Sequence, residues 1–179
     1  MKEFKIASIF ACLLLSVSSV AAEQLNIDFS YERNVNIGTI QPSLKLAAFG
    51  DDRDVSDGKV LTEDYTLNAP LAEIVRDAFA QGFAKGGVEL VDADEDMQVV
   101  GTIISSEAEM LERGGVQNIQ LTIRTAIQLQ GNGRTIWETT LFGRGRVPET
   151  EGMTAAVNSS LERMVRELFS DDYFLIELQ

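Results

Sequence analysis

Asn118–Gln130, NIQLTIRTAIQLQ, is the stretch that decides the fold. Polar or small side chains separate its apolar ones, which are Ile119, Leu121, Ile123, Ile127 and Leu129. This period of two predicts a β-strand with one buried face and one face toward solvent. A strand of this length needs paired neighbours, so the turns on either side of it decide the rest of the sheet.

The turn before this strand is Gly114-Gly115, which predicts an antiparallel hairpin with the preceding residues. In this register Met110 lies opposite Ile119. Further from the turn, Ile104 lies opposite Thr125. With the hairpin that follows, the prediction is three long antiparallel strands, at about Met97–Leu111, Val116–Gln130 and Arg134–Val147.

The turn after this strand allows two registers. A two-residue Asn132-Gly133 turn would set Ile127 opposite Glu138 and mix the two faces. A slip of one residue moves every side chain of a strand to the other face, so we predict the three-residue loop Gly131-Asn132-Gly133 instead. That loop sets Ile127 opposite Trp137, Ile123 opposite Leu141, Ala126 beside Glu138 and Gln120 beside Arg144.

Two stretches with helical periodicity flank the three strands. The first opens at Asn68-Ala69-Pro70, where Asn is a favourable N-cap and Pro is tolerated in the first turn, and it ends at Gly86-Gly87. The second runs from about Glu151 to Phe169. Each has one apolar stripe: Leu71, Ile74, Val75, Ala78, Phe79 and Phe83 in the first, and Met153, Val157, Leu161, Met164, Val165 and Leu168 in the second.

The remaining segments are shorter. Ser43–Phe49 alternates as a strand does, and Val88–Val91 is β-prone. Acidic loops are predicted over residues 50–66 and Asp92–Asp96. The tail Asp171–Gln179 is too apolar for a free end, so we expect it to dock against the body.

This order of elements predicts an α+β fold, a two-layer sandwich in which two amphipathic helices cover one face of a mainly antiparallel sheet. The predicted organisation is a signal peptide over residues 1–22, an extended lead-in over residues 23–42 and a single domain over residues 43–179.

Met1–Ala22 has the features of a secretory signal peptide. Lys2 and Lys5 precede an apolar run that is too short to span a bilayer, and Val20-Ala21-Ala22 supplies small residues for cleavage after Ala22. Cys12 lies inside the apolar run, so it does not fit a lipidation site. We therefore expect export to the periplasm, without an outer-membrane tether and without disulfides.

The composition excludes several kinds of chemistry. The chain has 179 residues, a formal net charge of −13 and no His. This acidity argues against binding nucleic acid and against direct docking on an anionic membrane, so any membrane contact is expected to be indirect. The absence of His excludes Ser-His-Asp and Cys-His catalysis and His-based zinc sites. We expect no enzyme activity, no catalytic residues and no cofactor.

The acidic loop that follows Gly50 resembles an EF-hand in its spacing. Counted from Asp52, acidic or hydroxyl side chains occupy positions one, three and five, and Glu63 occupies position twelve. The Gly required at position six is replaced by Asp57. We therefore expect a solvated loop and no metal site. Asp92–Asp96 is likewise interpreted as a solvated loop. Acid–base catalysis by paired carboxyl groups requires that their pKa values differ, and the sequence shows no hydrophobic pocket or cationic partner that would separate them.

Several segments resemble one family. Leu71–Val75 with Gly86–Val91, then Gly115–Asn118 with Gly131–Gly133, and Ala155–Leu161 are similar to the YajG-like family of small bacterial envelope lipoproteins. The lipopolysaccharide-assembly and transporter-auxiliary lipoproteins are more distantly similar. The resemblance extends from Ser43 to the C-terminus. It implies a protein that faces the periplasm and serves as an accessory part of a larger assembly.

The solvent-facing side of the predicted sheet holds a candidate partner surface. Three Arg side chains form a small basic strip there, and Glu107, Glu109 and Glu138 on the same face favour cross-strand charge pairing. Four apolar side chains are also predicted on this face, and a contiguous apolar group marks an interface. The candidate residues are Val99, Ile103, Ile136, Phe142, Arg124, Arg144 and Arg146.

The function predicted from the sequence is a non-enzymatic periplasmic accessory or scaffold protein of a bacterial envelope assembly, acting by protein–protein contact. Its expected partner is an envelope protein or a second copy of the chain. The alternative is a binding module for a lipid or other small amphiphile, held between the helices and the sheet.

Overall fold

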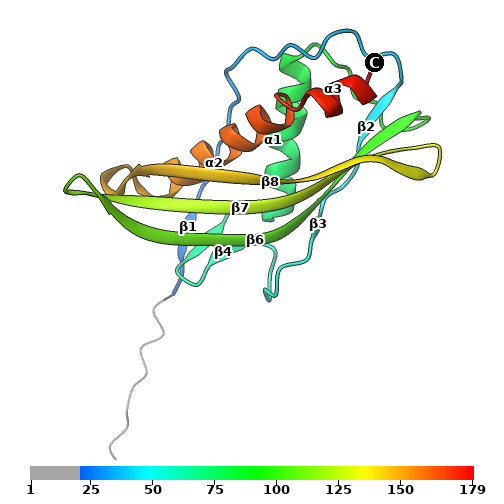
Figure 1. The fold of residues 1–179 in the computed structure, drawn as a ribbon. Coiled ribbons are helices and arrows are strands. Elements are labelled where there is room, and N and C mark those ends of the chain that lie inside the picture. Colours follow the sequence, from blue (N-terminus) through cyan, green and yellow to red (C-terminus); the bar gives the residue numbers. More distant parts are fainter. Residues whose placement is uncertain (1–20) are drawn as a thin grey trace, which may run out of the picture.

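The computed structural model describes residues 21–179, and in it three long strands cross the whole molecule with helices on one side (Figure 1). The strands are β6 (Met97–Arg113), β7 (Val116–Gly131) and β8 (Arg134–Pro148), all antiparallel. Helix α1 (Leu71–Lys85) lies over β6, and α2 (Gly152–Leu168) lies over β7 and β8. The predicted α+β sandwich is confirmed. Most of the predicted signal peptide, with Cys12, lies outside the described residues.

Five short strands precede and accompany α1. β2 (Leu44–Leu46) and β3 (Gly50–Asp51) extend the main sheet, each parallel to β6. β1 (Glu23–Leu25), β4 (Val60–Thr62) and β5 (Tyr65–Leu67) form a second small sheet, in which β1 is parallel to β5. The expectation that residues 50–66 form only a loop is therefore wrong. The reason is burial, since Leu61 and Leu67 of the β4–β5 hairpin are core residues.

The extended lead-in is part of the core. Leu25, Ile27, Tyr31 and Ile37 are buried. Two side-chain amides hold this segment, which has few strand partners of its own. Asn68 accepts a hydrogen bond from the Ile27 amide at 3.0 Å and donates to the Ile27 carbonyl at 3.4 Å. Gln81 accepts from Tyr31 N at 2.8 Å and donates to Phe29 O at 2.9 Å.

The predicted role of Asn68 as the N-cap of the first helix is wrong. Helix α1 begins at Leu71, and Pro70 occupies the cap position without a side-chain hydrogen bond. The Asn68 side chain instead binds the lead-in. The other predicted features of this helix are confirmed: Gly86 ends it, and its apolar stripe is buried apart from the half-buried Ile74.

The β6–β7 hairpin has the predicted register near its turn and a different one beyond residue 104. Met110 lies opposite Ile119, as predicted, but Ile103 and not Ile104 lies opposite Thr125. Ile104 is the extra residue of a β-bulge, which moves the preceding part of β6 by one position and so exchanges its faces. Val99 and Ile103 are therefore completely buried, and the prediction that they face solvent is wrong.

The β7–β8 hairpin follows neither predicted register along its whole length. Gly131 pairs with Arg134, so the turn is the two-residue Asn132-Gly133. A second bulge at Ile136 then moves the register, and Leu129 pairs with Trp137. Because of this extra residue, the apolar side chains of β7 and β8 lie on the same face of the sheet, as they would with a three-residue loop. The actual partners are Thr139 for Ile127, Gly143 for Ile123, Thr140 for Ala126 and Arg146 for Gln120.

Helix α2 approaches β8 closely because two inward-facing residues of the strand have no side chain. A Cβ on Gly143 would lie 2.8 Å from the Ser160 carbonyl oxygen, and one on Gly145 would lie 2.7 Å from the Ser160 nitrogen and clash with the Ala156 carbonyl oxygen. The Ser160 hydroxyl donates a hydrogen bond to the Gly143 carbonyl. The helix is preceded by a short 3₁₀ turn, η1 (Glu149–Glu151).

The C-terminal tail docks against the body as predicted, and it does so as a helix, α3 (Asp172–Glu177). The Asp171 carboxylate caps this helix by accepting from Phe174 N at 3.0 Å. Phe174 is fully buried and packs on Trp137, with ring centroids 4.9 Å apart. The predicted strand over residues 43–49 is confirmed in a shorter form as β2, whereas the one over residues 88–91 is reduced to one bridge between Leu44 and Leu90.

The close contact between Gly145 and α2 predicts that adding one methyl group at this position strongly lowers stability. We expect Gly145→Ala to lower the free energy of unfolding by about 3 kcal/mol, since α2 must move away from β8 to make room. Gly50→Ala is the matched control, because its Cβ would meet Thr102 Oγ1 at an ordinary 3.5 Å. Denaturant unfolding of the two variants measures the difference. Equal stability of both variants would contradict the close packing.

Candidate partner-binding surfaces

The outer face of the sheet keeps only part of the predicted partner surface. All three helices lie on the other face (Figure 1). Of the four predicted apolar residues, Phe142 alone is exposed there, at 40%. Val99 and Ile103 belong to the core, and Ile136 is half-buried over Gly131. The predicted apolar patch therefore does not form.

Arg124 and Phe142 form the centre of this outer face. They are cross-strand partners on β7 and β8, and the Arg124 guanidinium carbon lies 5.3 Å from the centroid of the Phe142 ring. An Arg cation over an aromatic face is an attractive arrangement. Both residues were predicted from the sequence, and the structure brings them together.

Arg146 takes part in a polar chain across three strands. Its guanidinium donates to the Gln120 side-chain oxygen, at 3.0 Å from Nε, and the Gln120 amide donates to the Glu109 carboxylate. The expected direct pairing of Arg and Glu is replaced by a Gln that bridges them. Arg144 is exposed on the same face.

A second polar chain crosses the far end of this face. Gln98 donates to Gln130 at 3.0 Å, Gln130 to Gln128 at 2.8 Å, and Gln128 to Glu138 at 3.3 Å. The amide and carboxylate groups of the outer face thus largely satisfy one another.

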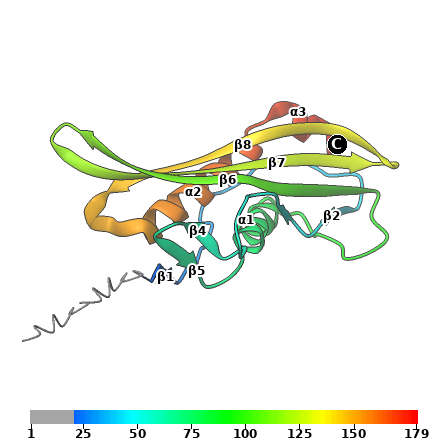
Figure 2. The same cartoon turned by 90° about the horizontal axis from the view of Figure 1, so that it is seen from below.

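The edge of β6 is a second candidate surface, which the sequence did not reveal. β2 and β3 pair with β6 only as far as Ile103. Beyond that point the Ser106 hydroxyl donates to the Leu61 carbonyl at 2.6 Å, and no strand of the described chain pairs with residues 107–113 on this side. Figure 2 shows the tip of the β6–β7 hairpin extending past the helices.

Two hollows lie along this edge, between β6 and the β4–β5 hairpin. The first, near the tip, has a volume of about 340 Å³ and is lined by Thr62, Glu63, Asp64, Tyr65, Ala108, Glu109, Met110, Ile119 and Met153. The second, of about 790 Å³, continues toward the loop at Arg53. They share Thr62, Glu63 and Ala108, so together they form one groove.

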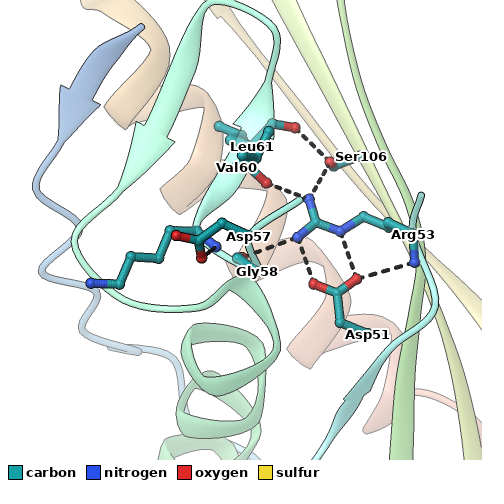
Figure 3. A network of polar contacts seen from close by, with 8 residues as sticks. Asp51, Arg53, Asp57, Gly58, Val60, Leu61 and Ser106 are labelled. Carbon is teal, nitrogen blue, oxygen red and sulfur yellow. Dashed lines mark hydrogen bonds and ion pairs between the residues drawn. The ribbon is translucent and has the colours of Figure 1, made fainter. Parts of the chain in front are cut away.

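Arg53 holds the wall of this groove in place (Figure 3). Its side chain is only 4% exposed, and it pairs with Asp51 through Nε and Nη2 at 2.8 and 2.7 Å. Nη1 donates to Val60 O at 2.6 Å and to Ser106 Oγ at 2.8 Å, and Nη2 also donates to Gly58 O at 3.1 Å. All guanidinium N–H groups are used, and they connect the loop, β4 and β6.

Carboxylates of the two predicted acidic loops form hydrogen bonds within the protein. Hydrogen bonds from Arg53 hold the pKa of Asp51 below its usual value. Asp57 accepts from Lys59 N at 2.9 Å, as a turn residue does. Hydrogen bonds from Ser43 likewise lower the pKa of Asp96 in the second loop. Among residues 21–179, no three acidic side chains come close enough to hold a metal ion.

Sequence reasoning missed Arg53 although one feature pointed to it. It is the one cation within the acidic residues 51–57, two residues from Asp51. That spacing favours a local pair. Its contacts with Val60 and Ser106 come from tertiary structure and have no pattern in the sequence.

The fold defined here, a long antiparallel meander with helices on one face, is found in a known protein. No protein-family model matches the chain, and comparison with curated proteins finds no match. A protein of Xanthomonas campestris described with the family model DUF330 superimposes with a TM-score of 0.63 at 12% identity, covering 87% of this chain and 97% of that one. At this identity the likeness shows the fold alone.

Two further solved structures are similar at lower TM-scores. A minor lipoprotein of Acinetobacter baumannii gives 0.46 at 10% identity, covering 75% of this chain and 93% of that one. A PelC dodecamer of Paraburkholderia phytofirmans gives 0.44 at 11% identity, covering 74% of this chain and 90% of that one. Within the described residues, no helix is long and apolar enough to cross a membrane.

The Asp51–Arg53 pair predicts a pH-dependent contribution to stability. At pH 7 we expect Asp51→Asn to cost about 3 kcal/mol, because it leaves a buried cation without its partner. Since the folded state lowers the pKa of Asp51, the contribution is complete above the pKa of the unfolded chain and is lost as pH falls through the lowered value. The variant and the native protein should therefore converge in acid.

Denaturant unfolding at a series of pH values from 7 down to about 1.5 tests this convergence. Asp54→Asn is the control, because Asp54 is the exposed carboxylate on the other side of Arg53. We expect it to change stability by less than about 0.5 kcal/mol at any pH. A difference between Asp51→Asn and the native protein that does not depend on pH would contradict the ion pair.

Proposed function

We propose that this chain is a non-enzymatic periplasmic protein, an accessory or scaffold component of a bacterial envelope assembly, which acts by protein–protein contact. The observation that carries the proposal is the Arg124–Phe142 pair at the centre of a sheet face that bears no helix of residues 21–179. Arg and aromatic residues are enriched in protein interfaces and in the residues that contribute most to binding.

The order of the outer face supports the same proposal. The side-chain amides of this face and the carboxylates of Glu109 and Glu138 are already hydrogen-bonded to one another, so little entropy of these side chains is lost when a partner covers them. Export is proposed from the features of Met1–Ala22. The partner is an envelope protein or a second copy of the chain.

The alternative, a binding module for a lipid or amphiphile held between the helices and the sheet, gains no support from Phe79, Phe83 and Met164 of the helix stripes, and only Met153 of the α2 stripe lines a hollow, at the edge of β6. Phe79, Phe83 and Met164 are fully buried. Met164 fills the space beside Gly143, and its sulfur accepts a hydrogen bond from Thr125 Oγ1 at 3.5 Å. These side chains pack the interface between helices and sheet and do not line a cavity there.

A photo-crosslinking amino acid at position 142 tests the proposal in native cells. We expect one discrete adduct, whose mass and peptides distinguish an envelope partner from a second copy. Position 163 is the control, since Arg163 is exposed on α2, on the helix side of the molecule. Absence of an adduct at 142, or the same adducts from both positions, would contradict contact through the outer face.

The Arg124–Phe142 pair also predicts the effect of substitution. We expect Arg124→Ala with Phe142→Ala to weaken partner binding by about tenfold or more, as truncation at an interface centre does. Folding should change little, because Phe142 is 40% exposed. Recovery of the partner with the purified variant, compared with an Arg163→Ala control, measures the effect. Undiminished recovery would place the contact elsewhere.

A further inference from the structure

We propose that the free edge of β6, Glu107–Arg113, binds an extended, positively charged segment of a partner protein by strand addition. This inference rests on the contact function proposed above and gives the chemistry of the partner. It concerns the edge of the sheet and the groove beside it, whereas the proposal above concerns the outer face.

The first argument is the unused backbone of the edge. In an antiparallel strand, alternate N–H and C=O groups point away from the neighbouring strand. β7 pairs with one side of residues 107–113, and no strand of the described chain pairs with the other side. Such an edge is a template for an added strand, and main-chain hydrogen bonds then supply affinity.

The second argument is the hollow that runs along this edge. Alternate side chains of an added strand would point into it, because side chains of a strand alternate between faces. There they would meet Met110, Ile119 and Met153, and Met110 is 54% exposed. Met side chains adapt to neighbours of different shape, so this end of the groove suits apolar side chains without demanding one type.

The third argument is charge. Residues 62–65 and 107–113 contain five carboxylates and one cation, Arg113, and none of the five forms an ion pair within the described chain. The carboxylates belong to Glu63, Asp64, Glu107, Glu109 and Glu112. Arg53 does not offset them, because Asp51 already neutralises it.

This charge selects the occupant. A segment that alternates Lys or Arg with apolar residues would place its cations on the outer face of the sheet, beside Glu107 and Glu109, and its apolar side chains in the hollow. A second copy of this edge would bring like charges together. Acidic side chains on an exposed edge therefore prevent self-pairing while they favour a basic partner.

Synthetic peptides test the proposal on the whole protein. The first probe alternates Lys and Val over seven residues, and the second alternates Glu and Val. We expect the basic peptide to bind at least about tenfold more tightly, with affinity falling as salt is raised. Fluorescence anisotropy of the labelled peptides measures both affinities. Equal affinities, or no binding of the basic peptide, would overturn the proposal.

A third peptide separates strand addition from simple charge attraction. It keeps the basic sequence but carries N-methyl groups on alternate backbone amides, in two versions that block either set of N–H groups. Neither charge nor side chains change. We expect one version to bind about tenfold more weakly than the parent, because ladder hydrogen bonds are lost. Unchanged affinity of both versions would overturn strand addition.

A matched pair of charge reversals locates the site on the protein. Glu107→Lys with Glu109→Lys reverses two exposed carboxylates of the edge itself and should weaken the basic peptide by about tenfold or more. Glu89→Lys with Asp92→Lys makes the same change in net charge on exposed residues at the opposite end of β6, and it should have little effect. Equal losses would overturn the location. If position 142 still crosslinks to a partner when the peptides fail, this inference falls and the contact function stands.

Discussion

The β-bulge at Ile104 divides β6 into two parts that differ in which face is buried and in whether the strand edge is paired. Before it, Val99 and Ile103 point into the core, and β2 and β3 pair with the strand edge. After it the faces exchange, the parallel pairing has ended, and no strand within residues 21–179 pairs with the edge. Bulges bend strands and redirect side chains in this way, and they frequently border functional surfaces. One inserted residue therefore separates the part of the β6 edge that is paired with β2 and β3 from the part that is accessible to a partner.

Arg53 complements this division by keeping the β4–β5 hairpin at a fixed distance from the open half. A Lys could not replace it. The planar Arg53 guanidinium donates to an aspartate, two carbonyls and a hydroxyl, whereas the ammonium of Lys has only three N–H donors, all on one nitrogen. A buried ion pair contributes little net stability compared with apolar residues, but separating its partners is costly, so Arg53 and Asp51 stay in contact. This contact sets the width of the groove.

The sequence predicted the elements more reliably than their junctions. Alternation in β7 and the apolar stripes of α1 and α2 identified the sandwich, because burial of one face leaves a repeated pattern. The bulge at Ile104 leaves no such pattern, since Ile103 and Ile104 are equally suitable for the core and each satisfies one register. Of the candidate surface, Arg124, Phe142, Arg144 and Arg146 were placed on the correct face. The groove could not be predicted, because it forms between segments that are distant in sequence.

The parallel pairing of the N-terminal strands has a consequence for the order of folding. β6, β7 and β8 are joined by two-residue turns and need only local contacts to form. β1, β2 and β3 must wait for parallel partners that lie some forty to fifty residues further along the chain, β1 for β5 and the other two for β6. Closing loops of that length costs entropy before any contact repays it. We expect the meander to form first, so residues 23–51, although synthesised earlier, should be the last part of the described chain to reach its native place.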